Sequence, residues 1–168
     1  MKEINPDLAV LIAQANNTVE IIEQNQQFYL NFKENEFLLL GKSTVSAMVL
    51  SQIFVDFYTC VETFLFRVSQ EFENNLRKDQ WHKELLQKMS LNISELRPAL
   101  LSKETAIILS ELLLFRHFRR YYFNFSYDWG KLDLIEEKFQ KVIPLLISDI
   151  RNFVSFLQEI EIQDVEKN

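Results

Sequence analysis

The sequence predicts an all-α protein built as a helical bundle, and three observations lead to that prediction. Only two glycines and three prolines occur in 168 residues, so residues that interrupt helices are scarce. Apolar side chains recur every three or four positions over long stretches, which is the spacing of one helix face. Apolar residues make up 48% of the chain, enough for one core in a chain of this length. We therefore expect a single domain over residues 1–168, an up-and-down bundle of four long helices and one short helix.

The first long helix begins near the N-terminus. Asn5 is a good N-cap, Pro6 suits the first helical position, and Asp7 complements the helix dipole. The polar residues Asn16, Asn17 and 24–27 predict a weak point or a kink within this helix. Gly41 then ends the region.

The second long helix is expected to run from Ser43 or Thr44, either of which can cap it, to about Leu76. A broad apolar stripe marks its buried face, and Cys60 lies within that stripe. A short helix over about residues 80–89 follows.

A connector over residues 92–101 leads to a third long helix, at about 103–124, with Ser102 as its N-cap. After a turn at residues 128–130, where Asp128 is a candidate cap, the last helix is expected to reach about Glu161. Pro144 predicts a kink in it.

Charge and cysteine content restrict the function classes. The net charge of −6 argues against broad electrostatic binding of nucleic acid, although it leaves room for a local basic site. The lone Cys60 cannot form an internal disulfide, which fits a reducing compartment. The N-terminus does not resemble a signal peptide, and no unbroken apolar run reaches about 18 residues. We expect a cytoplasmic protein that has no membrane partner.

The segment from residue 112 to 123 combines cationic and aromatic side chains. On a helix, its three arginines share one face with two aromatic residues: Arg116, Arg119, Arg120, Phe123 and Tyr127. The neighbouring face carries His117, Tyr121 and Asn124. Arginine forks bind phosphate and aromatic rings stack on bases, so the pattern suits RNA or a nucleotide.

A structural explanation of the arginines stays open. Each could pair with an acidic residue of another helix, such as Glu62, Glu111 or Asp149. His82 and His117 are the only histidines, and neither has a second metal ligand at a suitable spacing, so we expect neither a metal site nor a cofactor.

Four patches, in order along the chain, carry a family resemblance. They lie at residues 81–89, 97–102, 111–120 and 127–129. Together they resemble the HepT-like branch of the HEPN family over about residues 45–160. The resemblance implies a HEPN-like helical bundle, a homodimer, and in many members a metal-independent ribonuclease. It also implies a toxin–antitoxin system in which a minimal nucleotidyltransferase is the partner and can modify a tyrosine of the toxin with AMP.

The family's ribonuclease motif is incomplete in this chain. The motif arginine falls on Arg116, and the polar residue after it on His117. The motif histidine falls on Tyr121, and the tyrosine that accepts AMP falls on Phe123, which has no hydroxyl group. A tyrosine with an ordinary pKa of about 10 is a poor base at neutral pH. His117 lies one turn from Tyr121 and is the nearest substitute.

These observations lead to one leading interpretation and two alternatives. The leading one is a toxin–antitoxin component that binds RNA or the nucleotidyltransferase through Arg116, Arg119, Arg120, Asn124 and Tyr127, with a degenerate ribonuclease motif. The first alternative is an active endoribonuclease that uses Arg116 and His117. The second is a non-catalytic, antitoxin-like or structural helical protein.

Overall fold

The computed structural model describes residues 6–73, 81–121 and 126–167. Within these ranges there are four long and two short helices: α1 (Pro6–Glu34), α2 (Glu36–Leu40), α3 (Thr44–Phe72), α4 (Trp81–Met89), α5 (Lys103–Tyr121) and α6 (Trp129–Lys167). The described ranges contain no strand, and the only β-type pairing in them is an isolated bridge between Ile93 and Arg97. The prediction of an all-α bundle is confirmed. The five-residue helix α2 is an addition that the sequence analysis did not anticipate.

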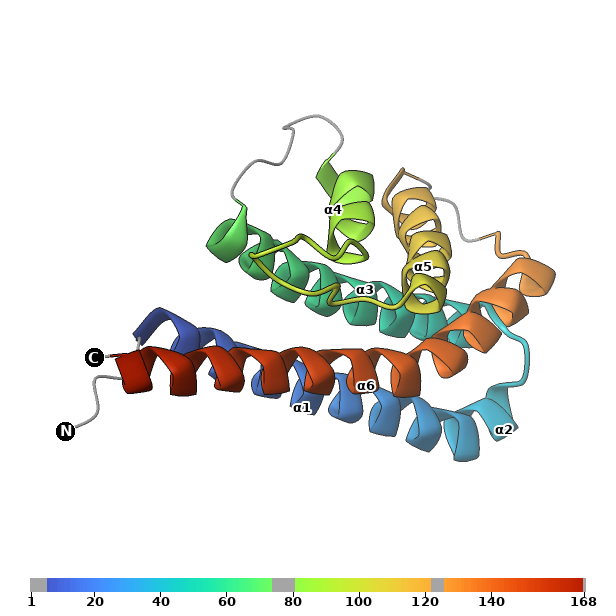
Figure 1. Ribbon diagram of the computed structural model, residues 1–168. Helices are drawn as coiled ribbons and strands as arrows, with labels where there is room; N and C mark the ends of the chain where they lie inside the picture. Colours follow the sequence, from blue (N-terminus) through green and yellow to red (C-terminus); the bar gives the residue numbers. More distant parts are fainter. Residues whose placement is uncertain (1–5, 74–80, 122–125, 168) are drawn as a thin grey trace.

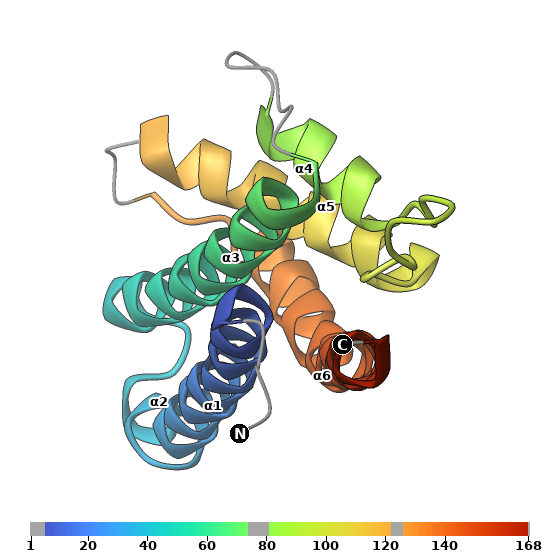
Figure 2. The same ribbon diagram turned by 60° about the vertical axis from the view of Figure 1, so that its left-hand side comes forward.

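Three long helices form the base of the molecule. Helix α1 runs antiparallel to both α3 and α6, and each of the three contacts the other two (Figure 1). Helices α4 and α5 lie across α3 on the side opposite α1, as Figures 1 and 2 show from two directions. The contacts of α5 are with α3, α4 and α6. The N-terminal end of α5 lies between other helices, and its C-terminal end points away from α1, α3 and α6 (Figure 1).

Helix α3 is the central helix of the core. It is long and apolar enough to cross a membrane by length and composition, but half of its most apolar stretch is buried inside the structure. Its buried residues include Phe54, Phe57 and Phe64, each at most 2% exposed. Burial of this kind is typical of a core helix that is covered on several sides.

Local capping interactions set the helix starts that the sequence predicted. The Ser43 hydroxyl accepts a hydrogen bond from the backbone N–H three residues later, at 3.1 Å. Ser102 does the same at the start of α5, at 3.2 Å, and the Asp128 carboxylate does so at the start of α6, at 3.3 Å. These contacts satisfy backbone donors that the first helical turn leaves without a partner.

Two features of the long helices differ in detail from expectation. Helix α1 continues through its polar middle without interruption, and there the Asn25 side chain donates to the backbone carbonyl of Ile53 on α3 at 3.3 Å. Helix α6 extends past Glu161 to Lys167. Helix α6 changes direction along its length in Figure 1, and Pro144 lies inside this helix. The expected boundaries at Asn5, Leu76 and Asn124 fall outside the described residues.

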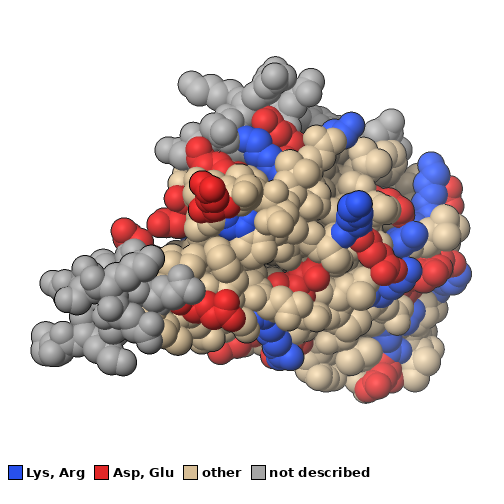
Figure 3. Space-filling model, viewed as in Figure 1, with Lys and Arg blue, Asp and Glu red and all other residues tan. Residues whose placement is uncertain are grey.

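Acidic and basic side chains are interspersed on the face shown in Figure 3, with no broad basic surface there. This distribution agrees with the net charge of −6. An anion site on this face would therefore depend on a local cluster of basic residues.

Candidate functional site

Helix α5 carries two kinds of side chain along a single face. Its first half buries Ile108, Leu109 and Leu112, each at most 2% exposed. Because successive residues turn by about 100°, Arg116, Arg119 and Arg120 continue this same face over the next two turns. The core-facing stripe of the helix therefore changes from apolar to cationic at Arg116.

A cavity of about 400 Å³ opens between α3 and α5 at that change. Six residues line it: Gln52, Val55 and Thr59 from α3, and Arg116, Arg119 and Arg120 from α5. None of the six is acidic. The cavity therefore presents three guanidinium groups together with an amide and a hydroxyl group, a lining that favours an anion.

Arg116 is held in place but is not saturated with hydrogen bonds. Its Nε donates to the Thr59 hydroxyl at 3.1 Å, its Nη1 lies 3.5 Å from Glu62 Oε1, and its Cζ lies 5.9 Å from the centre of the Tyr58 ring. Nη1 is buried and has no hydrogen-bond partner among the described residues. A ligand in the cavity would meet Arg116 through the rest of its guanidinium group, because Nη1 is buried and faces Glu62.

Only one of the structural pairings considered for the arginines occurs. Glu62 does pair with Arg116. Glu111 instead pairs with Lys138 at 3.5 Å, and Asp149 accepts the backbone N–H of Ser102 at 2.9 Å.

A buried carboxylate joins the arginine to a second helix. Glu62 is 4% exposed, and its Oε2 lies 2.6 Å from His82 Nδ1 on α4. The His82 ring in turn lies edge-on to the His117 ring, with 5.3 Å between their centres. Glu62 thus bridges Arg116 and His82, and the two histidines of the chain meet beside the cavity.

The pKa shifts in this cluster follow from burial and charge. Burial lowers the pKa of His117, and the nearby His82 and Arg116 lower it further. His117 is therefore mainly neutral at pH 7. Burial, reinforced by the Glu62 carboxylate, raises the pKa of the Tyr58 hydroxyl, so Tyr58 stays protonated.

Aromatic stacking fixes α4 where His82 can reach Glu62. Trp81 stacks on the His82 ring with 3.8 Å between centres, and it also packs against Phe66 of α3 at 5.2 Å. His82 was not predicted as part of the site, and Glu62 was predicted only as one of several acidic residues that could pair with an arginine. An acidic residue within the apolar stripe of α3 was the one signal in the sequence that pointed to Glu62.

The structure brings together most of the residues expected at the site. Arg116, Arg119 and Arg120 share the cavity, and His117 lies on the neighbouring face of α5. Tyr127 contacts this group of residues through Arg119: the Cζ atom of Arg119 lies 4.9 Å from the centre of the Tyr127 ring. Phe123, Asn124 and the side chain of Tyr121 lie outside the described residues.

Metal ligation has no candidate in the described ranges, where no three His, Cys, Asp or Glu side chains form a suitable group. Cys60 is unpaired with another cysteine and partly buried. Burial raises the pKa of its thiol, which keeps it protonated and weakly nucleophilic.

Comparison with known proteins gives one match. No curated protein and no solved structure matches the chain at a significant level. The sequence profile of a family described as HepT-like protein matches residues 49–157, which is more than half of the chain and includes α4, α5 and every residue of the arginine-lined cavity. The chain belongs to the HepT-like protein family.

Proposed function

We propose that this protein is a HEPN-type component of a toxin–antitoxin system and that it binds RNA through the cavity lined by Arg116, Arg119 and Arg120. Family membership supports the general role. The observation that carries the RNA-binding proposal is the cavity itself, which three arginines line together without an acidic residue among the lining residues. Guanidinium forks match the geometry of phosphate oxygens.

RNA is expected to bind only at the cavity, and its affinity is expected to depend only modestly on salt concentration. The remainder of the protein is acidic, so only the few phosphates near the cavity gain from electrostatic attraction. Arg116 is expected to be the central contact because it lines the cavity and its Nε is held there by the Thr59 hydroxyl. Arg120, the most exposed of the three, adds charge at the opening.

Cleavage of the bound RNA is expected to be slow. The family's histidine is replaced by Tyr121, and loss of general acid–base assistance costs about 100- to 10,000-fold in rate. Phe123 stands where the family's AMP acceptor would be, so silencing by modification at that position is chemically excluded.

The test is a binding titration with a labelled single-stranded RNA, followed by fluorescence anisotropy. Arg116→Ala should weaken binding at least tenfold, the loss of about 1.4 kcal/mol expected for one charge-assisted contact. The matched control is Arg151→Ala, which removes the same charge from an exposed side chain on α6 that pairs with Glu23. Equal affinities for the two variants would contradict the proposal.

A second candidate function is an active ribonuclease, and the meeting of the two histidines favours it. His117 adjoins Arg116 in sequence and is neutral at pH 7, as a general base must be. Glu62 orients the neighbouring His82 through Nδ1. In this case His117 would take the proton of a ribose 2′-hydroxyl group, and Arg116 would stabilise the charge that develops on the phosphate.

Cleavage of labelled RNA distinguishes the two functions. If the natural protein is silent and Tyr121→His cuts, the protein is a binding component with an otherwise intact cleft. If the natural protein cuts, and His117→Ala abolishes cutting, the ribonuclease candidate replaces the leading one.

The family also motivates two partner proposals. We propose a homodimer, to be checked by light scattering of the purified protein, and a minimal nucleotidyltransferase partner, to be checked by co-expression with a neighbouring gene of that kind. A monomer would contradict the first proposal, and failure of the two proteins to copurify would contradict the second.

A further inference from the structure

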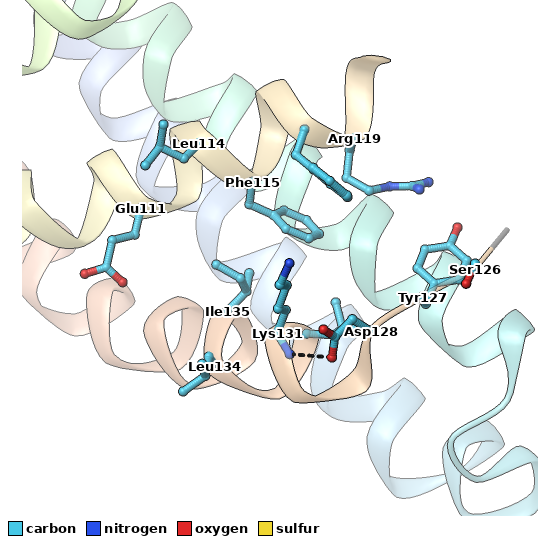
Figure 4. Close-up of a pocket in the computed structure, with 12 residues that line it drawn as sticks. Glu111, Leu114, Phe115, Arg119, Ser126, Tyr127, Asp128, Lys131, Leu134 and Ile135 are labelled. Carbon is cyan, nitrogen blue, oxygen red and sulfur yellow. Dashed lines mark hydrogen bonds between the residues drawn. The ribbon is translucent and has the colours of Figure 1, made fainter. Parts of the chain in front are cut away.

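A second cavity, of about 350 Å³, lies between α5 and the first turns of α6 (Figure 4). In Figure 4 the labelled side chains of the two helices face each other across it, and Tyr127 closes one end. Its walls are mainly apolar: Leu114, Phe115, Phe118, Tyr127, Leu132, Leu134 and Ile135. The polar groups are Glu111, Arg119, Ser126, Asp128 and Lys131.

Arg119 connects this cavity to the arginine-lined one. Its side chain lines both cavities, and its guanidinium lies against the Tyr127 ring, with 4.9 Å from Cζ to the ring centre. The two cavities are therefore adjacent compartments with opposite character. One is aromatic and largely apolar, and the other is cationic.

We propose that the aromatic cavity is a nucleobase subsite, which receives the base next to the phosphate held by Arg116, Arg119 and Arg120. The inference rests on the proposed RNA binding and adds to it a specific place for one base. A nucleotide is the ligand class that combines a flat ring with polar edges and a phosphate a few bonds away. The volume lies within the range of about 300–1,000 Å³ that is usual for small-ligand sites.

The side chains of the cavity suit a ring of this kind. Phe115 is half-buried and packs against Phe54 of the core at 6.2 Å, so it provides a fixed wall. Phe118, on the same helix, is 47% exposed and lines the cavity nearer to solvent. Aromatic side chains bind every base through its π-face, so the subsite is expected to tolerate any base.

Tyr127 offers a further point of contact. Its hydroxyl oxygen is buried and has no hydrogen-bond partner among the described residues. Such a group gains from any rearrangement that brings it to the polar edge of a base. The charged groups in the lining are of both signs: Glu111, which pairs with Lys138, and Asp128 are acidic, and Arg119 and Lys131 are basic.

The experiment compares a short labelled oligoadenylate with an abasic ribose–phosphate oligomer of the same length. The natural protein should bind the oligoadenylate about tenfold more tightly, the effect of one base stacking on an aromatic side chain. Phe118→Ala removes a wall and Ile135→Trp fills the cavity. Both variants should lose this preference while keeping the affinity for the abasic oligomer.

The matched control is Ile107→Ala, which removes an exposed apolar side chain of α5 (61% exposed) that does not line the cavity. It should keep the preference. Equal binding of the two oligomers by the natural protein, or an unchanged preference in both cavity variants, would overturn the subsite and leave the RNA-binding proposal standing. If neither oligomer binds, the proposed RNA binding fails, and the subsite fails with it.

Discussion

Two arginine–glutamate pairs in this protein differ in how completely the arginine is used. Arg97, in the connector before α5, has a fully buried side chain that pairs with Glu73 at the end of α3. Its Nε donates to Glu73 at 2.7 Å, and its Nη atoms donate to Glu73 and to the backbone carbonyls of Lys88, Leu91 and Pro98. Arg97 therefore ties the segment between α4 and α5 to α3.

Arg116 also meets a buried glutamate, but its contacts are fewer and looser. Its side chain is 15% exposed, Glu62 lies 3.5 Å away, and its Nη1 has no hydrogen-bond partner among the described residues. The comparison teaches how to separate the roles of buried arginines. An arginine whose donors are saturated by the protein supports the fold, and one that lines a cavity with fewer and longer contacts to the protein is suited to a ligand.

The largest expected effect is on stability at the saturated pair. Arg97→Ala should lower the free energy of unfolding by about 3–5 kcal/mol, because Glu73 and three carbonyl groups lose their buried partner. Urea denaturation measures the loss, with Arg151→Ala as the control. A loss below about 1 kcal/mol would remove the structural role assigned to Arg97.

Urea denaturation should show a smaller loss of unfolding free energy when the Arg116–Glu62 pair is broken. Arg116→Ala is expected to cost about 1–2 kcal/mol, because Glu62 keeps His82 as a close partner. The comparison breaks down if Arg116→Ala destabilises the protein as much as Arg97→Ala. The Arg116 pair would then be a structural contact first.

The salt dependence of RNA binding tests whether Arg120 contacts the RNA backbone. Arg120 is exposed and lines the cationic cavity, so Arg120→Ala should change stability by less than about 0.5 kcal/mol. The slope of log affinity against log salt should become shallower by about 0.7, the value for one lost contact to a single strand. An unchanged slope would place the RNA backbone elsewhere.

The smallest effect concerns pH and His117. Its pKa is lowered in the folded protein, so the unfolded chain binds the proton more readily between that lowered pKa and about 6.5. Stability should therefore fall as pH decreases through this window. His117→Gln should remove that part of the fall, a difference below about 1 kcal/mol because the side chain is only partly buried. If the natural protein and the His117→Gln variant have the same dependence of stability on pH, the pKa of His117 is not lowered in the folded protein.

Local patterns made most of the fold predictable. The caps Ser43, Ser102 and Asp128 act on residues three positions away, and helix faces repeat over four residues, so a short stretch of sequence contains the necessary information. Helix α2 was missed because Gly41, which ends it, had been interpreted only as the end of a longer segment. The five residues of α2 are too few to show a period.

The candidate site was only partly predictable. The arginine face of α5 follows from helical spacing. The partner of Arg116 does not, since Glu62 was one of several acidic residues that could have reached it. The place of His82 was not predictable either, because it contacts Glu62 from a separate helix, 20 residues further along the chain.

The long helices of this chain, and the change of one helix face from apolar to cationic at Arg116, follow from the amino-acid sequence alone. Those properties depend on interactions within a few residues. Only the tertiary structure decided which arginine is saturated, that His82 meets His117, and that Arg119 lies between a cationic and an aromatic cavity. These outcomes depend on how α4, α5 and α6 cross α3 and each other, and packing between distant segments is set by the whole core rather than by any local pattern.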